Sequence, residues 1–599
     1  MKKYFLILIF LATSISVFPQ DEKKITILFT NDLHSRLTGY APESDYTPLT
    51  VSDDKTRGGF ARIASILKKE RSESTGITLT LDAGDFLMGT LFQSLEPETG
   101  FQLKLMKTMG YDVVAIGNHE FDYGPAKLAS ILQSAGKSGM PDVLLSNAVF
   151  DSKDTADNSL ERCFREDLVK RNVIVEKGGL KFGFFSLMGK VADDNAAFAK
   201  PVTFGKQVKT AKRMVKQLHD QGCDIIICLS HSGVEKNSDG SWGGEDVELA
   251  GKVKGIDIII SGHTHTVLEE PVIVNGIPVV QTGEYGKFTG KMTLTYLNGK
   301  LKLDSYSLVP VDDQILGDEQ VNLLIENEKE EINERILKPI GMDYDSPVAE
   351  AGFPLECNEQ GDFMNSNLAP LVADAIYSYV NRHAQGGTDI SMVAVGVIRD
   401  NVTPGIQTVP DIFRLMSMGA GNDNVPGYPL ARVYVSGKEL KSILEILQVA
   451  YKSAAANYCY YSGIKFDYDP DGGLLKKIKK IEIEKTGKPA EAVDFSKKNK
   501  KLYSITANSY MLEFVGIIKK MSFGLINVVP KDASGNPVRD MKTAIIDMND
   551  KLPGIQEGKE WLSLVEYLKS MKDTDNDGIP DIDPEYRKSI SSFNIVTKR

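Results

Sequence analysis

Residues 112–122 read Asp-Val-Val-Ala-Ile-Gly-Asn-His-Glu-Phe-Asp, and this stretch holds both a fold signal and a chemical one. Its first half, Asp112–Ile116, is a short apolar run of the kind that forms a buried strand. Its second half places Asn118, His119 and Asp122 directly after a glycine, which lets the backbone turn sharply. The stretch therefore predicts a buried strand whose end delivers polar side chains.

The same pattern recurs through the first half of the chain. Helical patterns lie between the runs, from Arg57 through Lys69 and over Val208–His219. Strands that alternate with helices indicate an α/β layered domain, which usually holds its sites at the strand ends. The other predicted strands are Ile25–Thr30, Ile77–Leu81, Val143–Leu145, Phe182–Leu187, Asp224–Leu229 and Asp257–Ile260.

Each of five strand ends supplies Asp, Asn or His. Oxygen and imidazole donors without thiolates suit Mn, Zn, Fe or Co rather than a cysteine-rich structural zinc site. One Asp-x-His pair alone is more often a hydrogen-bonded polar pair than a metal site, but five strand ends in one order favour a metal site. The Asp, Asn and His residues at these ends are Asn31, Asp32, His34, Asp82, Asp85, Asn118, His119, Asp122, His231, His263 and His265.

Composition places the chain among ordinary globular proteins. It has 599 residues, 42% of them hydrophobic and 25% charged, with a formal net charge of −11. An acidic balance argues against a nucleic-acid polymer as partner, although it allows a small phosphorylated substrate held by metal. Five cysteines in a chain of this length do not indicate a disulfide scaffold.

The N-terminus predicts export. A basic start at residues 1–3 precedes an apolar run from Tyr4 to Val17, which is typical of a signal peptide over residues 1–20. A retained N-terminal anchor is the alternative. No later stretch is long and apolar enough to cross a bilayer, so we expect an exported protein, periplasmic or extracellular, with no stable membrane span.

The strand-end series resembles the calcineurin-like metallophosphoesterases. With the large second half and the signal peptide, the chain resembles the secreted 5′-nucleotidase / UDP-sugar hydrolase family, strongly over residues 24–310 and weakly over 350–540. The resemblance implies an α/β protein with an N-terminal four-layer α/β/β/α sandwich, a linker helix and a C-terminal α+β substrate domain. The expected boundaries are 24–312 for the metallophosphoesterase domain, 313–340 for the helix, 341–568 for the C-terminal domain and 569–599 for an acidic tail. A plain surface helix is an equal interpretation of 313–340.

The resemblance also assigns roles at the strand ends. It implies two divalent metals bridged by Asp85, with Asp32, His34 and His265 on one metal and Asn118, His231 and His263 on the other. Two such cations clamp phosphoryl oxygens and lower the pKa of a bound water, whose hydroxide then attacks phosphorus. His119 and Asp122 match the family's catalytic dyad. A third-ligand or structural role for His119 is the alternative.

The C-terminal half matches the family less well. Val395-Gly396-Val397-Ile398-Arg399 is similar to its Gly-Gly-x-Ile-Arg strand end, so Arg399 is expected to bind substrate; a structural salt bridge is the alternative. The aromatic segments that sandwich the nucleobase in the family are altered. Tyr428, Tyr510 and Phe514 are candidate substitutes, although ordinary packing is the favoured interpretation of each because tyrosine is common in this chain.

The tail carries a separate signal. Carboxylates alternate around Gly578 in a pattern that resembles calcium loops, but Pro584 stands where an EF-hand loop has its last Glu. A calcium-binding loop and a solvated acidic linker are both compatible with this pattern. The candidate calcium ligands are Asp573, Asp575, Asp577 and Asp581.

The sequence as a whole predicts an exported two-metal phosphoesterase that converts nucleoside 5′-monophosphates to nucleoside and phosphate. One alternative is the same metal centre acting on a phosphodiester, a cyclic nucleotide or a nucleotide-sugar. Another is a secreted calcium-binding protein without activity. Neither the preferred substrate, the native metals nor the oligomeric state follows from the sequence.

Overall fold

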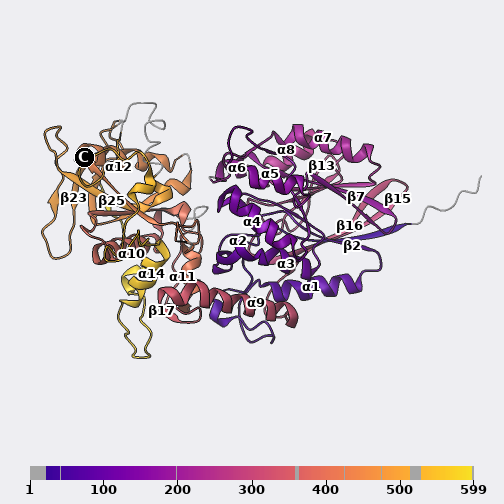
Figure 1. Ribbon diagram of the computed structural model, residues 1–599, viewed down its shortest axis with the longest axis horizontal. Coiled ribbons are helices and arrows are strands. Elements are labelled where there is room, and N and C mark those ends of the chain that lie inside the picture. The colour runs from indigo at the N-terminus through magenta and orange to yellow at the C-terminus, as the bar shows by residue number, and fades with distance from the viewer. Residues whose placement is uncertain are drawn as a thin grey trace, which may run out of the picture.

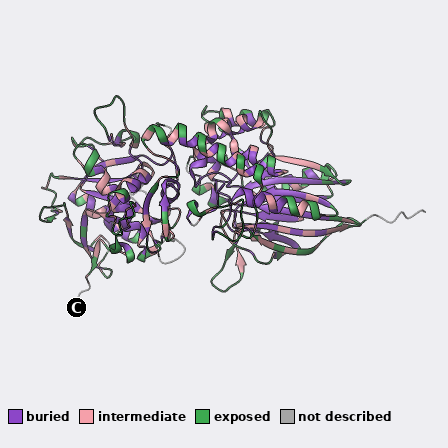
Figure 2. Cartoon of the chain, turned by 90° about the horizontal axis from the view of Figure 1, so that it is seen from below, coloured by how far each residue is buried: buried purple, intermediate pink, exposed green. Residues whose placement is uncertain are grey.

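The computed structural model describes residues 22–596 apart from 41, 197, 358–362, 424, 453, 474 and 513–527. The predicted signal peptide and Phe514 therefore lie outside the described residues. Two bodies lie side by side, one from the first half of the chain and one from the second, and buried residues fill both of them (Figures 1 and 2). No helix within the described ranges is long and apolar enough to cross a membrane.

The N-terminal body is built on two six-stranded sheets that pack face to face. Apolar side chains alternate along each strand, so Ile27 and Phe29 point to the opposite sheet while Leu28 points to the outer helices. The first sheet has the order β16-β15-β1-β2-β3-β4. Its strands are β16 (Lys300–Pro310), β15 (Phe288–Leu297), β1 (Lys23–Thr30), β2 (Ile77–Asp82), β3 (Val113–Ala115) and β4 (Asp142–Leu144).

The second sheet has the order β13-β14-β12-β9-β7-β6. Its strands are β13 (Val272–Val274), β14 (Ile277–Val280), β12 (Ile258–Ser261), β9 (Ile225–His231), β7 (Leu180–Met188) and β6 (Asn172–Lys177). Helices α7 (Gln207–Asp220) and α8 (Glu245–Lys252) pack on its outer face. Helices α1 (Phe60–Glu73), α3 (Phe101–Met109) and α4 (Gly124–Gly136) cover the first sheet, which completes the predicted α/β/β/α sandwich.

The C-terminal body is α+β, as predicted. One four-stranded sheet has the order β20-β25-β18-β21, formed by β20 (Leu430–Ser436), β25 (Leu502–Asn508), β18 (Ile390–Ala394) and β21 (Cys459–Ser462). Helices α10 (Leu368–His383), α12 (Gly437–Ala450) and α14 (Glu560–Lys569) pack around it (Figure 1). Helix α9 (Glu319–Ile332) precedes this body and buries Val321, Ile325 and Ile332.

The tail, residues 569–599, packs on the C-terminal body over its described part. Strand β26 (Phe593–Ile595) pairs in parallel with β22 (Ile464–Tyr468), and Tyr586 is fully buried and donates a hydrogen bond to Asp374 at 2.8 Å. Ile582 is also buried, and its N–H donates to the backbone oxygen of Glu350. These apolar residues follow the acidic run directly, so the run is a loop held at both ends by the C-terminal body.

Candidate metal centre and active site

Backbone hydrogen bonds join the loops that follow β1 and β2. The N–H of Asp32 donates to Gly84 O at 2.9 Å, and the N–H of His34 donates to Asp85 O at 3.0 Å. Gly84 has a φ of +95°, where an added Cβ would lie 2.8 Å from the Gly117 nitrogen. Glycine at this position therefore lets three strand-end loops approach one another closely.

Asp32, His34 and His265 form one group of ligand-type atoms, all within 4.8 Å of one another. The Nε2 atoms of His34 and His265 face each other at 3.0 Å, and the His265 Nε2 lies 3.5 Å from Asp32 Oδ1. His34 comes from the loop after β1 and His265 from the loop after β12, on different sheets. The sandwich thus brings together residues more than two hundred positions apart in the sequence.

Asp85, His231 and His263 form the second group within the same 4.8 Å limit. The His231 Nε2 lies 2.9 Å from Asp85 Oδ2 and 3.2 Å from Asn118 Oδ1. The two groups are in direct contact, since the backbone N–H of His263 in the second group donates to both carboxylate oxygens of Asp32 in the first, at 3.1 and 3.0 Å. All seven predicted donors therefore meet in one place.

The chemistry of this cluster fits divalent cations. Burial lowers the pKa of His34 well below its usual value, and burial with the neighbouring His231 lowers the pKa of His263 to about 3, so both rings are neutral, as a metal ligand has to be. Burial also opposes the charge of His231, but Asp85 more than offsets this and raises the pKa of His231 to about 10. A cation at this place would take over the role of that proton.

His119 and Asp122 lie beside the second group. The His119 Nδ1–H donates to Asp122 Oδ2 at 2.9 Å, and the His119 backbone N–H donates to Asp85 Oδ1 at 2.8 Å. Burial lowers the pKa of His119, yet the carboxylates of Asp122 and Asp85 outweigh burial and raise it overall. The two carboxylates therefore favour the charged form of the ring, and its Nε2 faces away from the hydrogen bond with Asp122.

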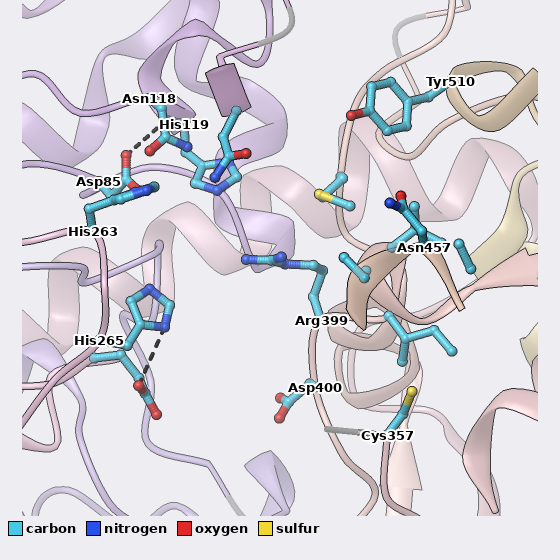
Figure 3. Close-up of a pocket in the computed structure, with 18 of the residues that line it drawn as sticks. Asp85, Asn118, His119, His263, His265, Cys357, Arg399, Asp400, Asn457 and Tyr510 are labelled. Atoms are coloured by element: carbon cyan, nitrogen blue, oxygen red, sulfur yellow. Dashed lines mark hydrogen bonds and ion pairs between the residues drawn. The ribbon is translucent and has the colours of Figure 1, made fainter. Parts of the chain in front are cut away.

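Arg399 reaches the cluster from the C-terminal body, as Figure 3 shows. Its Nε is buried and has no hydrogen-bond partner among the described residues. The adjacent carboxylate of Asp400 is engaged elsewhere, by Arg36 Nη1 at 2.9 Å and by Arg414 Nε at 3.2 Å. The Arg399 guanidinium therefore stands beside the metal cluster as a donor available to an anion.

A cavity of about 1270 Å³ separates the two bodies, and both contribute to its walls. Asp85, His119 and His263 line one side, while Arg399 and Tyr510 line the other (Figure 3). Three aromatic rings from the two bodies also line the cavity and pack together. The rings of this aromatic group are Tyr428 and Tyr510, stacked at 5.4 Å and 7°, and Phe198, 6.0 and 6.3 Å from them. Phe198 was not predicted, because nothing in its local sequence marks it.

Several carboxylates of the acidic loop over residues 573–581, here called the tail loop, lie close together. Ligand-type oxygens of Asp573, Asp575 and Asp581 lie within 4.8 Å of one another, and those of Asp575 and Asp577 do so with Glu350. Glu350 comes from β17 (Pro347–Ala351), far away in the sequence, so no local pattern could have included it. The loop also uses these carboxylates internally, since Asp573 accepts from the N–H groups of Asn576 and Gly578.

Comparisons with known proteins agree with this geometry. Residues 25–267 match the calcineurin-like phosphoesterase family model, and residues 349–516 match the model of the 5′-nucleotidase C-terminal domain. The chain is 26% identical to a "Probable 5′-nucleotidase" of Treponema pallidum, over 82% of this chain and 86% of that protein. It is also 26% identical to Protein UshA of Yersinia enterocolitica, over 66% of this chain and 72% of that protein.

A solved structure, the 5′-nucleotidase precursor of Thermus thermophilus, aligns with 96% of this chain and 100% of its own, with a TM-score of 0.64 and 21% identity. This likeness bears on the fold, which has the same two-body organisation. The two family models match one chain in the order that the sequence predicts. The chain therefore carries a calcineurin-like phosphoesterase domain followed by a 5′-nucleotidase C-terminal domain, and it is a phosphoric ester hydrolase.

Proposed function

We propose that this protein hydrolyses nucleoside 5′-monophosphates to nucleoside and phosphate. One observation carries the proposal: residues of both ligand groups, the His119–Asp122 pair and Arg399 all line one cavity. The metal identity is also a proposal, since the oxygen and imidazole donors suit Mn, Zn, Fe or Co. Two bound cations would polarise phosphoryl oxygens and lower the pKa of a water at the site.

The residues of the chain would divide the remaining work. Asp32, His34 and His265 would hold one cation and Asn118, His231 and His263 the other, with Asp85 between them. Arg399 would bind the phosphate with its planar donors. His119, oriented by Asp122, would hold a proton at Nε2 for the leaving oxygen, a role worth about 10²–10⁴-fold in rate.

The aromatic group would contact the base. Tyr428 and Tyr510 offer flat apolar faces in the wall opposite the metal cluster, and Phe198 adds a third ring from the N-terminal body. Stacking of a base on such rings contributes about 1–3 kcal/mol per base. This arrangement supports a nucleoside as the leaving group.

One observation favours a larger substrate as a second candidate. The cavity of about 1270 Å³ extends on the N-terminal side to Lys236 and Trp242, beyond the metal cluster. Pockets for small ligands usually measure about 300–1,000 Å³. A phosphodiester, cyclic nucleotide or nucleotide-sugar would use this additional space.

Two further proposals rest on sequence signals. We propose export to the periplasm or the cell exterior, supported by the basic and apolar pattern of residues 1–20. We also propose calcium for the tail loop, supported by the addition of Glu350 to the sequence-predicted carboxylates. The oxygen-only donor set matches the preference of calcium.

Purified protein with Mn²⁺ should release phosphate from AMP and UMP faster than it acts on UDP-glucose, 2′,3′-cyclic AMP or bis-p-nitrophenyl phosphate. We expect Asp85→Asn to abolish turnover and His119→Ala to reduce kcat about 10²–10⁴-fold. His219→Ala, on the exposed face of α7, is the matched histidine control and should leave turnover unchanged.

Each outcome of this assay decides between the candidates. Fastest turnover of UDP-glucose or a diester would replace the monophosphate proposal with the second candidate. Full activity in Asp85→Asn would refute the placement of the metals. An inactive wild type that still binds calcium would favour the non-enzymatic alternative.

A further inference from the structure

A buried carboxylate outside the predicted site lies directly behind two of its histidines. Asp246 is fully buried on helix α8, and no charged side chain pairs with it within the described residues. A buried carboxylate without a cationic partner is costly unless hydrogen bonds satisfy it. Its partners therefore indicate what the position is for.

The two side chains that donate to Asp246 are serines at the ends of neighbouring strands. Ser230 Oγ, on β9, donates to Asp246 Oδ1 at 2.5 Å, and Ser261 Oγ, on β12, donates to Oδ2 at 2.6 Å. The two serines are register partners in the parallel pairing of β9 with β12, and both are fully buried. One carboxylate therefore joins the ends of two adjacent strands.

Those two strand ends carry the histidines of a single ligand group. His231 directly follows Ser230, and His263 lies two residues after Ser261. The backbone is fixed on both sides, because the N–H of Gly262 donates to Ser230 O at 2.9 Å and the N–H of Gly233 donates to Asp246 Oδ2 at 3.1 Å. The other group, with His34 and His265, receives no hydrogen bond from Asp246 or its serines within the described residues.

We propose that Asp246 is a positioning residue for the metal held by Asp85, Asn118, His231 and His263, and not for the metal held by Asp32, His34 and His265. The inference rests on the proposed two-metal function. It assigns Asp246 a selective role: it holds two imidazoles at the spacing that one cation requires. Groups that orient metal ligands in this way typically change metal affinity about 10–100-fold when removed.

The substitution Asp246→Asn tests this with little change in volume. An amide has one acceptor oxygen in place of two, so it cannot accept from Ser230 and Ser261 on separate oxygens as the carboxylate does. Asp257→Asn is the matched control. Asp257 joins the same two strands at their opposite ends, where its Oδ2 accepts from the N–H of Ile226 at 2.8 Å, far from either histidine.

Metal binding is measured by calorimetric titration of chelator-treated full-length protein with Mn²⁺. Wild type and Asp257→Asn should each bind two equivalents with similar affinities. Asp246→Asn should keep one equivalent at wild-type affinity and bind the other about 10–100-fold more weakly. His231→Ala should lose binding of the same equivalent. The double variant Asp246→Asn/His231→Ala should bind the remaining equivalent with the same affinity as His231→Ala.

Other outcomes are equally informative. Two wild-type affinities in Asp246→Asn would overturn the inference while leaving the two-metal proposal intact. Equal weakening in Asp257→Asn would also overturn it, because general loosening of the sheet would then explain the effect. Failure of the wild type to bind Mn²⁺, Zn²⁺ or Co²⁺ would refute the proposed function itself. If Asp246→Asn does not fold, Ser261→Ala removes one of the same hydrogen bonds and should weaken the same equivalent.

Discussion

Five of the candidate metal ligands have an unusual backbone conformation. Asp32, His34, Asp85, His263 and His265 all have left-handed φ values, between +50° and +82°. Non-glycine residues rarely adopt this region, and each such residue costs about 1–3 kcal/mol. The surrounding packing holds them there, so side-chain placement at the cluster is maintained against local conformational preference.

Buried acids away from the cluster make stability depend on pH. Glu96, on α2 (Glu96–Thr99), is fully buried, and its Oε2 has no hydrogen-bond partner among the described residues. Burial, with a smaller contribution from Glu328, raises the pKa of Glu96 to about 8. The folded protein therefore keeps Glu96 protonated at pH values where the unfolded chain has released the proton.

We predict that Glu96→Gln flattens the pH dependence of the melting temperature. Because the pKa of Glu96 is higher in the folded state, its contribution to the free energy of unfolding is fully present below pH 4.5 and is lost as pH rises toward 8. Glu96→Gln has no titrating group at this position, so it does not lose this contribution. Its free energy of unfolding relative to that of wild type should rise from pH 5 to pH 8, by more than about 1.4 kcal/mol. Melting curves across this range check it. Glu98→Gln, exposed on the same helix, should follow wild type, and parallel curves for Glu96→Gln would contradict the prediction.

At the scale of elements, one rule produces most of the site. The carboxyl ends of parallel strands meet at one edge of each sheet, so the residues after β1, β2, β3, β9 and β12 converge when the two sheets pack together. The strand–loop pattern is local, and it was readable from the sequence. The pairing of one sheet with the other depends on long-range packing, which no local pattern records.

The tail loop supplies an element-scale prediction. We expect Ca²⁺ to raise the melting temperature of the full chain, since a ligand at 100 times its Kd adds about 2.7 kcal/mol. Asp575→Asn should remove most of this effect, because Asp575 belongs to both carboxylate groups. Asp550→Asn, exposed outside the loop, is the control. Equal calcium stabilisation of all three proteins would place the effect outside the loop and favour a solvated linker.

At the scale of the whole molecule, buried charges join the two bodies. Arg414 of the C-terminal body bonds Glu43 of the N-terminal body at 2.8 Å, while Arg36 and Arg414 both bond Asp400. Burial opposes the charge of Asp400, but the two arginines lower its pKa overall. Asp400 follows Arg399 and Arg36 lies two residues after His34, so this network links the proposed phosphate-binding arginine to the loop that carries a candidate metal ligand.

We predict that Arg414→Met destabilises the protein by about 3–5 kcal/mol, because it leaves Glu43 and Asp400 buried with lost partners. Arg36→Met should lower the free energy of unfolding by less, since Asp400 retains its ion pair with Arg414. Arg414→Met should also raise KM for AMP more than it changes Mn²⁺ binding, because the metal ligands all belong to the N-terminal body. Calorimetric melting, steady-state kinetics and titration check these expectations. Equal destabilisation by the two variants would contradict the network as described.

The layered N-terminal fold could be predicted from the sequence, because strand periodicity is local. The candidate metal donors and the His119–Asp122 pair could be named there too, because each lies in a short motif at a strand end. Only the tertiary structure placed Phe198 beside Tyr428 and Tyr510, Glu350 beside the tail loop, and Asp246 behind His231 and His263. Those contacts join segments whose separations range from tens to hundreds of residues. Their energies come from burial and from hydrogen bonds that exist only once the sheets and the two bodies have packed, so no pattern along the chain encodes them.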